Sequence, residues 1–330
     1  MICKKEIWIY AETESQKIAP SYYELLGKAH ELKESLNEAY EIVAVILSDS
    51  AEEVSKELRS SAVDRVYCLE HEKLGNYNPE YYAAVLSEFA KKHKPEMLWI
   101  AASAIGGELA PSVAALLNTG LAAHCVDILI NDKGELVHLV PAFGGKLLTE
   151  ILVPKTRPIM ASVKPGIFRE REIACSKEAE LVFERAEILD SMESRFKLVE
   201  EQEMQSSGLP VEKAEVVLAG GRGIGNTQTW EKLKELAGRL DGAVGYTRSL
   251  VDIGLEENEL NMIGSSGKSV RPKLYMGFGI SGASHHISGI KDSGTIIAVN
   301  TDDEADIFDS SDYKIVADCD RILSALLEVL

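Results

Sequence analysis

Short apolar runs alternate with amphipathic stretches along the first part of the chain. Four runs rich in β-branched and aromatic residues predict strands over 7–11, 42–47, 63–69 and 97–102. Apolar residues at helical spacing predict helices over 22–36, 51–61, 80–92 and 108–117. Further strands are expected over 125–130, 136–140 and 159–163. Such alternation is typical of a parallel sheet with helices on both faces.

A polar run over residues 199–210 interrupts this pattern. Its apolar residues do not recur at helix or strand spacing, and it ends in Ser, Gly and Pro, as linkers do. A second alternation follows, with strands expected over 214–219, 243–246, 273–278, 295–300 and 314–317 and helices over 227–240 and 320–329. We therefore predict two α/β domains, over residues 1–200 and 213–330, joined by a linker over 201–212.

Composition narrows the class of protein. Of the 330 residues, 45% are hydrophobic and 27% are charged, as in globular proteins, and the net charge of −18 disfavours nucleic-acid or anionic-membrane partners. No apolar run reaches the roughly 18 residues that a membrane span needs, and the chain start has no signal- or transit-peptide features. Five scattered cysteines without a CxxC pair disfavour a disulfide framework or a cysteine metal site. We expect a cytoplasmic protein.

The most informative segment runs from Leu274 to Asn300. It predicts a buried strand, a turn of small residues, a helix start with His285 and His286, and a second buried strand. Such a turn brings backbone N–H groups to a helix N-terminus, where anionic ligands bind. A tight turn whose glycines only allow close packing explains the spacing equally well. The adjacent histidines raise the alternative of a metal site, but no carboxylate or cysteine lies beside them at ligand spacing.

Two other predicted strand ends carry candidate ligand contacts. Residues 220–225 form a glycine-rich loop between a strand and a helix, and Arg222 in this loop suits a bidentate phosphate contact. The loop is not the dinucleotide fingerprint, because Asn226 stands where the last glycine belongs, and it lacks the Gly-Lys-Ser/Thr of a P-loop. Thr247 and Arg248 follow the next strand, at the sheet edge where ligands bind. Close packing and surface ion pairing remain the alternatives.

The residues of the most informative segment resemble a known signature. The run LYMGFGISGASHHISGI, closing at IIAVN, is similar to the signature of the α subunit of electron-transfer flavoproteins, where it forms part of the FAD pocket. Further segments resemble this family in the same order, at 107–111, 119–123, 156–161, 218–223, 245–252, 263–268 and 307–318. The resemblance implies two doubly wound α/β domains. The N-terminal domain would be adenine-nucleotide-hydrolase-like (Rossmann-like) and pack on a β subunit, and the C-terminal parallel-sheet domain would bind FAD.

The resemblance also assigns contacts with FAD. Arg222 matches an arginine that meets FAD, and Arg248 matches one that lies against the flavin ring, where a fixed cation stabilises negative charge on the reduced flavin. His286 would lie near the flavin C2 carbonyl. Asn300 and Asp318 match positions that bind the adenosine and ribityl-phosphate part. The full predicted set is Arg222, Thr247, Arg248, Ile263, Gly264, Ser265, Ser266, Ser281, Gly282, Ala283, Ser284, His285, His286, Asn300, Asp318 and Cys319.

Four positions depart from the family pattern. Ser265 replaces a glutamine and lacks the reach of an amide, whereas the neighbouring Ser266 retains a hydroxyl that is expected near flavin N5. His285 also replaces a glutamine, Ser284 an aliphatic residue and Asp306 a proline. These substitutions leave open the alternative of a subunit that has lost FAD.

The resemblance implies an electron carrier that needs no catalytic residue and no metal in this chain. The chain would bind one FAD and pair with a β subunit that holds AMP, or a second FAD in electron-bifurcating members. It would pass electrons between a flavin dehydrogenase, often of the acyl-CoA type, and a quinone reductase or an acceptor such as ferredoxin. A bifurcating member that uses NADH is the nearest alternative. A stand-alone nucleotide-binding dehydrogenase is another, which the missing dinucleotide fingerprint disfavours.

Overall fold

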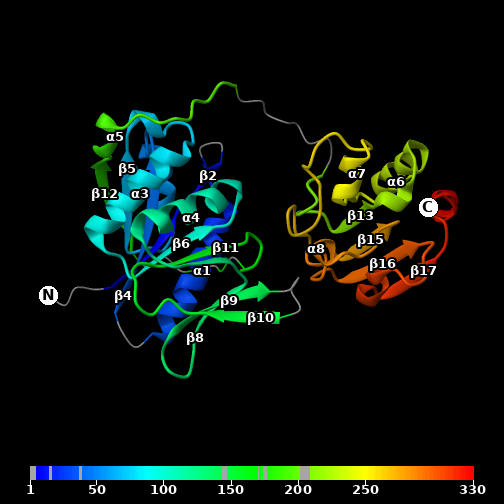
Figure 1. Cartoon of the computed structure of the whole chain (residues 1–330), viewed down its shortest axis with the longest axis horizontal. Helices are drawn as coiled ribbons and strands as arrows, with labels where there is room; N and C mark the ends of the chain where they lie inside the picture. Colours follow the sequence, from blue (N-terminus) through cyan, green and yellow to red (C-terminus); the bar gives the residue numbers. More distant parts are fainter. Residues whose placement is uncertain are drawn as a thin grey trace. The chain divides into compact units, whose positions relative to one another are not determined.

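The chain forms two compact units, and each is described by itself. The computed structural model describes residues 5–14, 17–36, 39–142, 147–169, 171, 173, 177–200 and 209–330. Unit 1 is Met1–Glu200 and unit 2 is Glu201–Leu330 (Figure 1). Within the described residues, none of the helices has both the length and the apolar content that a membrane crossing requires.

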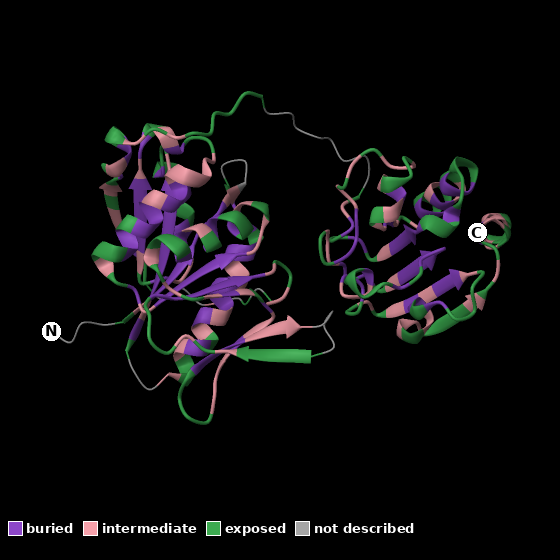
Figure 2. Ribbon diagram, viewed as in Figure 1, coloured by how far each residue is buried: buried purple, intermediate pink, exposed green. Residues whose placement is uncertain are grey.

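Unit 1 is built on a seven-stranded sheet in which all neighbouring strands are parallel. The strand order is β12-β5-β4-β1-β6-β11-β7. The strands are β1 (Lys5–Tyr10), β4 (Tyr40–Ser48), β5 (Arg65–Glu70), β6 (Met97–Ala101), β7 (Leu121–Cys125), β11 (Ile159–Val163) and β12 (Glu180–Arg185). The central strands are buried on both faces (Figure 2), which explains why they read as continuous apolar runs.

Helices cover both faces of this sheet and enclose two hydrophobic cores. Along β1, Ile7 and Ile9 face the core that α1 (Pro20–Ser35) and α2 (Glu52–Arg59) cover. Trp8 and Tyr10 face the other core, under α3 (Pro79–His93) and α4 (Ala104–Leu117). This period of two follows from the strand pleat. The predicted α/β class is confirmed, with helices on both faces as expected.

The remaining elements of unit 1 are small. An antiparallel sheet contains β8 (Asp127–Ile130), β9 (Leu136–Ala142) and β10 (Leu147–Ile151). The strand predicted over 125–130 corresponds to β8, but its start is wrong, because Cys125 belongs to β7 in the large sheet and β8 begins at Asp127. A two-stranded hairpin, a 3-10 turn and a short helix complete the unit: β2 (Thr13–Glu14), β3 (Lys17–Ile18), η1 (Glu72–Leu74) and α5 (Ile188–Ser191).

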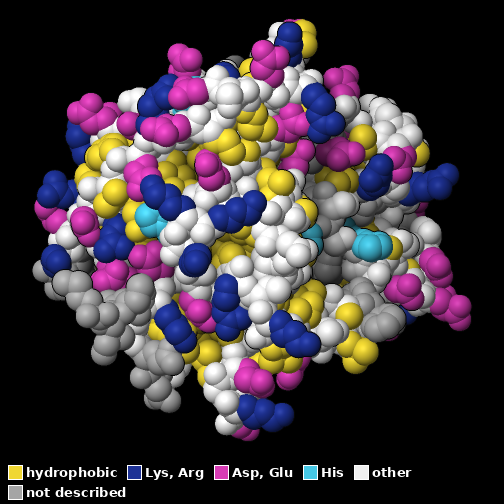
Figure 3. Space-filling model, turned by 60° about the vertical axis from the view of Figure 1, so that its left-hand side comes forward, with side chains coloured by type: hydrophobic (Ala, Val, Ile, Leu, Met, Phe, Trp, Pro, Cys, Tyr) yellow, Lys and Arg dark blue, Asp and Glu magenta, His cyan; other side chains and the backbone are white. Residues whose placement is uncertain are grey.

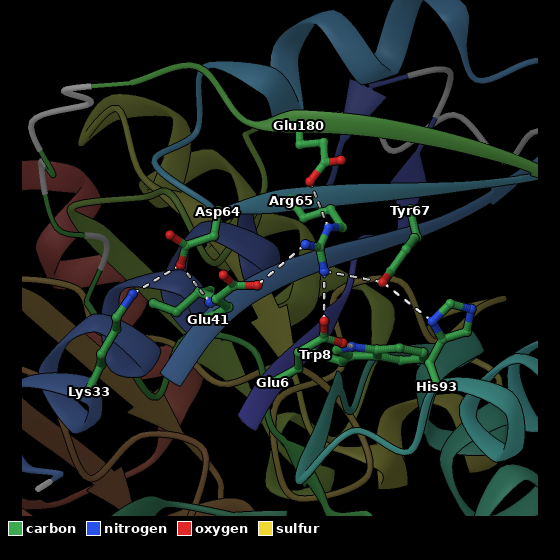
Figure 4. Close-up of polar contacts among 10 residues, drawn as sticks. Glu6, Trp8, Lys33, Glu41, Asp64, Arg65, Tyr67, His93 and Glu180 are labelled. Carbon is green, nitrogen blue, oxygen red and sulfur yellow. Dashed lines mark hydrogen bonds and ion pairs between the residues drawn. The ribbon is translucent and has the colours of Figure 1, made fainter. Parts of the chain in front are cut away.

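Arg65 joins the amino ends of four parallel strands of unit 1 (Figure 4). Its guanidinium lies 2.7 Å from Glu6 on β1, 3.5 Å from Glu41 on β4 and 3.0 Å from Glu180 on β12. The indole N–H of Trp8 donates to the second oxygen of Glu6 over 2.6 Å. This edge of the sheet is therefore a network of charges on a partly buried surface. Elsewhere, on the face in Figure 3, acidic and basic side chains are interspersed.

Unit 2 is a five-stranded parallel sheet with the order β14-β13-β15-β16-β17. Its strands are β13 (Val216–Gly220), β14 (Ala243–Tyr246), β15 (Leu274–Phe278), β16 (Thr295–Asn300) and β17 (Tyr313–Val316). The chain moves from β13 to one neighbour, β14, and then crosses to the other, β15. The sheet therefore has a topological switch point between β13 and β15, where doubly wound folds bind ligands.

Two longer helices and several short turns flank this sheet. Helices α6 (Thr227–Arg239) and α9 (Cys319–Val329) pack on one face, where Trp230, Leu233 and Leu323 share a buried core. The Asn226 side chain accepts the Thr229 N–H over 2.9 Å and so caps the start of α6. The short elements are η2 (Arg222–Ile224), α7 (Arg248–Asp252), α8 (Ser284–Ile287) and η3 (Asp306–Ser310).

Candidate functional site

A cavity of about 500 Å³ opens at the carboxyl edge of the unit 2 sheet. The loops that follow β13, β14, β15 and β16 line it. The lining residues are Gly221, Arg222, Gly223, Thr247, Ser249, Gly279, Ile280, Ser281, Asn300, Asp302, Glu304, Ala305 and Asp306. Because the cavity lies at the switch point, its position is the one that ligands occupy in other doubly wound sheets.

Glycine backbones from two loops meet in this cavity. The Gly223 N–H donates to the Gly279 carbonyl over 2.9 Å. A Cβ on Gly279, whose φ is +63°, would lie 2.5 Å from the Gly223 carbonyl carbon, and one on Gly221 would lie 2.5 Å from the Gly279 oxygen. Glycine is therefore required at these positions for the two loops to pack. This agrees with the interpretation of the sequence in which the glycines allow close packing. The same residues present bare backbone to the cavity.

Asn300 connects two of the loops that line the cavity. Its amide nitrogen donates to the Ile280 carbonyl over 2.9 Å, and its amide oxygen accepts the Asp302 N–H over 3.0 Å. The Ile307 N–H donates to the Ser281 carbonyl over 3.0 Å, so η3 packs directly on the turn after β15. These contacts hold the loops after β15 and β16 in one arrangement.

Arg222 supplies the cationic side of the cavity. It is exposed at the first position of η2, and no carboxylate among the described residues pairs with it. Thr247 lies across the cavity mouth from a different strand end, and its hydroxyl is 2.7 Å from that of Ser249. An exposed guanidinium is a group that binds phosphate. The N–H groups of Gly221, Gly223 and Gly279 donate to protein carbonyls, so these glycines offer close approach to a ligand rather than free donors.

The two adjacent histidines have different environments. His286 is buried, with Nε2 2.8 Å from the Tyr275 hydroxyl and Nδ1 3.0 Å from the Ile263 carbonyl. Burial lowers the pKa of His286 to about 4, although the hydrogen bond to Ile263 opposes the shift. The ring is therefore neutral near pH 7, Nδ1 donates to the carbonyl and Nε2 accepts from Tyr275. Both nitrogens are engaged within the protein, and contact with a flavin remains a prediction.

His285 is exposed, and its side chain contacts the loop that contains Ser265. Its Nδ1 lies 2.8 Å from the Ser265 hydroxyl, and its carbonyl accepts the Ser265 N–H over 2.7 Å. The two residues that replace family glutamines are therefore in direct contact. The helix expected after this turn is the four-residue α8, so a helix dipole contributes little to anion binding here.

The predicted site residues divide into two groups. Arg222, Thr247, Ser281 and Asn300 line the cavity. The Arg248 side chain is 66% exposed, and its Nε lies 3.8 Å from Asp252. The others lie outside the lining: Ile263, Gly264, Gly282, His286 and Cys319 are buried, and Ser265, Ser266, Ala283, Ser284, His285 and Asp318 are exposed. The Asp318 side chain caps α9 by accepting the Arg321 N–H over 3.1 Å.

The sequence interpretation missed the acidic part of the lining. Asp302 and Glu304 are absent from the predicted site residues, and Asp306 was noted only because it replaces a proline of the family pattern. One signal could have found them. They follow Asn300 directly, and residues just after the carboxyl end of a parallel strand reach the ligand edge.

Comparison with known protein families covers both units. Residues 7–187 match the electron transfer flavoprotein domain, and residues 210–291 match the electron transfer flavoprotein FAD-binding domain. The chain belongs to the electron transfer flavoprotein α-subunit family. The cavity therefore lies in the unit that carries the family's FAD-binding domain, and membership of this family implies a β-subunit partner.

Similarity to individual members of the family extends over nearly the whole chain. The electron transfer flavoprotein subunit alpha of Thermoanaerobacterium thermosaccharolyticum is 38% identical over 324 residues, which cover 98% of this chain and 97% of that protein. The subunit alpha of Clostridium acetobutylicum is 36% identical, with 98% and 96% covered. The acryloyl-CoA reductase electron transfer subunit beta of Anaerotignum propionicum is 31% identical, with 99% and 95% covered.

Proposed function

We propose that this chain binds one FAD in unit 2, pairs with a β subunit, and carries electrons between a flavin dehydrogenase of the acyl-CoA type and an acceptor such as a quinone reductase or ferredoxin. The observation that supports this most is the cavity at the switch point, in which Arg222 lies beside three glycine backbones. When bound, FAD supplies the redox chemistry. The chain supplies binding, orientation and electrostatics.

The cavity residues fit the diphosphate of FAD. Arg222 would neutralise it, and the bare backbone at Gly221 and Gly223 allows phosphate oxygens to approach closely. Thr247 and Ser281 add hydroxyl groups to the same lining. A relative named as an acryloyl-CoA reductase electron transfer subunit supports a dehydrogenase partner that acts on acyl-CoA.

Arg248 is our candidate for tuning the flavin potential. Among the described residues, its exposed side chain has no ion pair other than a 3.8 Å contact with Asp252, so it is available to a flavin ring. Because reduced flavin carries negative charge, Arg248→Ala lowers the potential, whereas Arg239→Ala, at an exposed ion pair on α6, leaves it unchanged. Potentiometric titration of the flavin spectrum measures both. Equal potentials in wild type and Arg248→Ala would exclude this role.

Flavin content tests the proposed function. The chain is co-expressed with its β partner, and the visible spectrum and FAD content per heterodimer are measured. We expect one FAD that depends on Arg222, so that Arg222→Ala reduces FAD content while Arg239→Ala does not. A heterodimer without flavin contradicts the proposal. Two FAD per heterodimer together with reduction by NADH would identify the bifurcating alternative.

A further inference from the structure

The cavity in unit 2 has a cationic side and an acidic side. Arg222 comes from the loop after β13, whereas Asp302, Glu304 and Asp306 come from the loop after β16, two strands away in the sheet. All three carboxylates are exposed, and among the described residues none of them forms an ion pair. A ligand in this cavity therefore meets a positive group at one end and three negative groups at the other.

The acidic loop has a defined conformation. The Asp302 N–H donates to the Asn300 side chain over 3.0 Å, and the Asp302 carboxylate accepts the Glu304 N–H over 3.1 Å. Asn300 in turn donates to the Ile280 carbonyl over 2.9 Å, which fixes this loop to the one after β15. The backbone of this loop and the Asp302 carboxylate are thus held at the cavity by contacts within the protein.

The residues that line the cavity indicate which part of FAD it holds. Arg222, a candidate phosphate contact, and Asn300, expected at the adenosine and ribityl-phosphate part, line it, although Asp318, expected at the same part, does not. Arg248, Ser266 and His286, expected at the flavin ring, lie outside the lining. With the diphosphate at Arg222, the carboxylates of the same lining would be the groups available to the neighbouring sugar hydroxyls. A carboxylate accepts hydrogen bonds from ribose hydroxyls and repels a phosphate in their place.

We propose that Asp302, Glu304 and Asp306 make the cavity selective for adenosine diphosphate groups whose ribose hydroxyls are free, and reject those with a phosphate on the ribose. The inference rests on the proposed function, because it places the adenosine diphosphate part of FAD in this cavity. The cavity would then accept FAD and exclude cellular nucleotides that share its adenosine diphosphate but carry a phosphate on the ribose, such as NADP and coenzyme A.

Paired ligands that differ by one phosphate test this proposal. FAD binding to the flavin-depleted heterodimer is measured first, and ADP-ribose and 2′-phospho-ADP-ribose are then titrated by calorimetry. Screened repulsion between a phosphate and three nearby carboxylates predicts about tenfold weaker binding of the phosphorylated ligand. In the triple variant Asp302→Asn, Glu304→Gln, Asp306→Asn, the two affinities become similar. Asp309→Asn, in η3 but outside the lining, keeps the wild-type ratio.

Each alternative outcome decides the question. Equal affinities in wild type, or an unchanged ratio in the triple variant, overturn the selectivity even if FAD binds. Failure of the wild type to bind FAD overturns the proposed function as well. Added salt provides a second readout, since it reduces the wild-type preference for the unphosphorylated ligand and leaves the ratio of the two affinities in the triple variant unchanged. A preference that does not depend on salt contradicts an electrostatic origin.

Discussion

Gly279 is a residue whose type is set by its neighbours in space. Its φ is +63°, and a Cβ at this position would lie only 2.5 Å from the Gly223 carbonyl carbon, so both the backbone and the packing exclude a side chain. Gly238, on α6, has no atom within 4 Å of the corresponding position. The sequence pattern predicts Gly238 within a helix and Gly279 in the turn after a strand. It does not reveal that Gly279 meets the Gly223 backbone, because that contact joins two loops far apart in the chain.

Gly279→Ala should therefore destabilise unit 2 by about 3 kcal/mol, through backbone strain and the clash with Gly223. It should also reduce FAD binding, because the loops that line the cavity must separate. Gly238→Ala is the matched control, and we expect it to stabilise the protein by about 0.5–1 kcal/mol because it lies in a helix. Denaturant unfolding and FAD titration measure both effects. Wild-type behaviour of Gly279→Ala would contradict the loop packing described above.

His286 should make the stability of unit 2 depend on pH. Burial lowers its pKa in the folded state to about 4, whereas the unfolded chain binds the proton near pH 6.5. The unfolded state thus holds more protons between these values, and stability is lost as pH falls through this window. From about pH 7.5 to about pH 5 the loss attributable to His286 is about 2 kcal/mol.

Comparison with His286→Gln isolates this contribution. The variant removes the titrating ring, so its free energy of unfolding should change with pH by about 2 kcal/mol less than that of the wild type. The comparison is made on flavin-free protein by denaturant unfolding at the two pH values. The test compares only the change in the free energy of unfolding between the two pH values, so a variant that is less stable at both pH values is still informative. Parallel losses in the two proteins would show that His286 does not titrate between them.

At the residue scale, the sequence singled out Arg222, Thr247, Ser281 and Asn300, at strand ends or in the turns that follow them, and all four line the cavity. Their contact with FAD stays a prediction. The environment of His286 was not predictable, because its partners Tyr275 and Ile263 are separated from it by 11 and 23 residues. Such contacts are set by how strands and loops pack and leave no local pattern.

At the element scale, the strands buried on both faces were predicted, whereas the exposed edge strands were predicted only in part: β17 was expected over 314–317, but β10 and β12 were missed. Strands β1, β6 and β11 consist almost entirely of buried residues, so their apolar runs stand out. Strands β10 and β12 lie at sheet edges and are mostly exposed or half-buried, and their sequences were not recognised as strands. Edge strands lack the pattern because their apolar residues have little to bury against.

Arg65 should matter more than its single charge suggests, because it contacts carboxylates on three other strands (Figure 4). Arg65→Met would remove the guanidinium that contacts both Glu6 and Glu41, neighbouring carboxylates that are 15% and 17% exposed. We expect a loss of about 2 kcal/mol of stability, measured by denaturant unfolding. Lys56→Gln, at the exposed pair with Glu53, should change stability by less than about 0.5 kcal/mol. Equal effects would contradict the network.

At the scale of the whole molecule, each unit has hydrophobic cores of its own, two in unit 1 and two in unit 2. We therefore expect two transitions in calorimetric unfolding. FAD should raise the midpoint of only one of them, since a ligand stabilises the unit to which it binds. Gly279→Ala should lower the same transition, and Arg65→Met the other. A single transition that shifts with every change would show that the units unfold together.

The late position of β12 in the chain affects how unit 1 folds during its synthesis. It pairs with β5, although Arg65 and its partner Glu180 are 115 residues apart in the chain. As the ribosome releases the chain from its N-terminus, β5 has a sheet edge with unpaired backbone groups until residues 180–185 emerge. The nascent protein is thus most open to pairing with other chains during this interval. A chaperone that acts between the synthesis of β5 and that of β12 would protect it best.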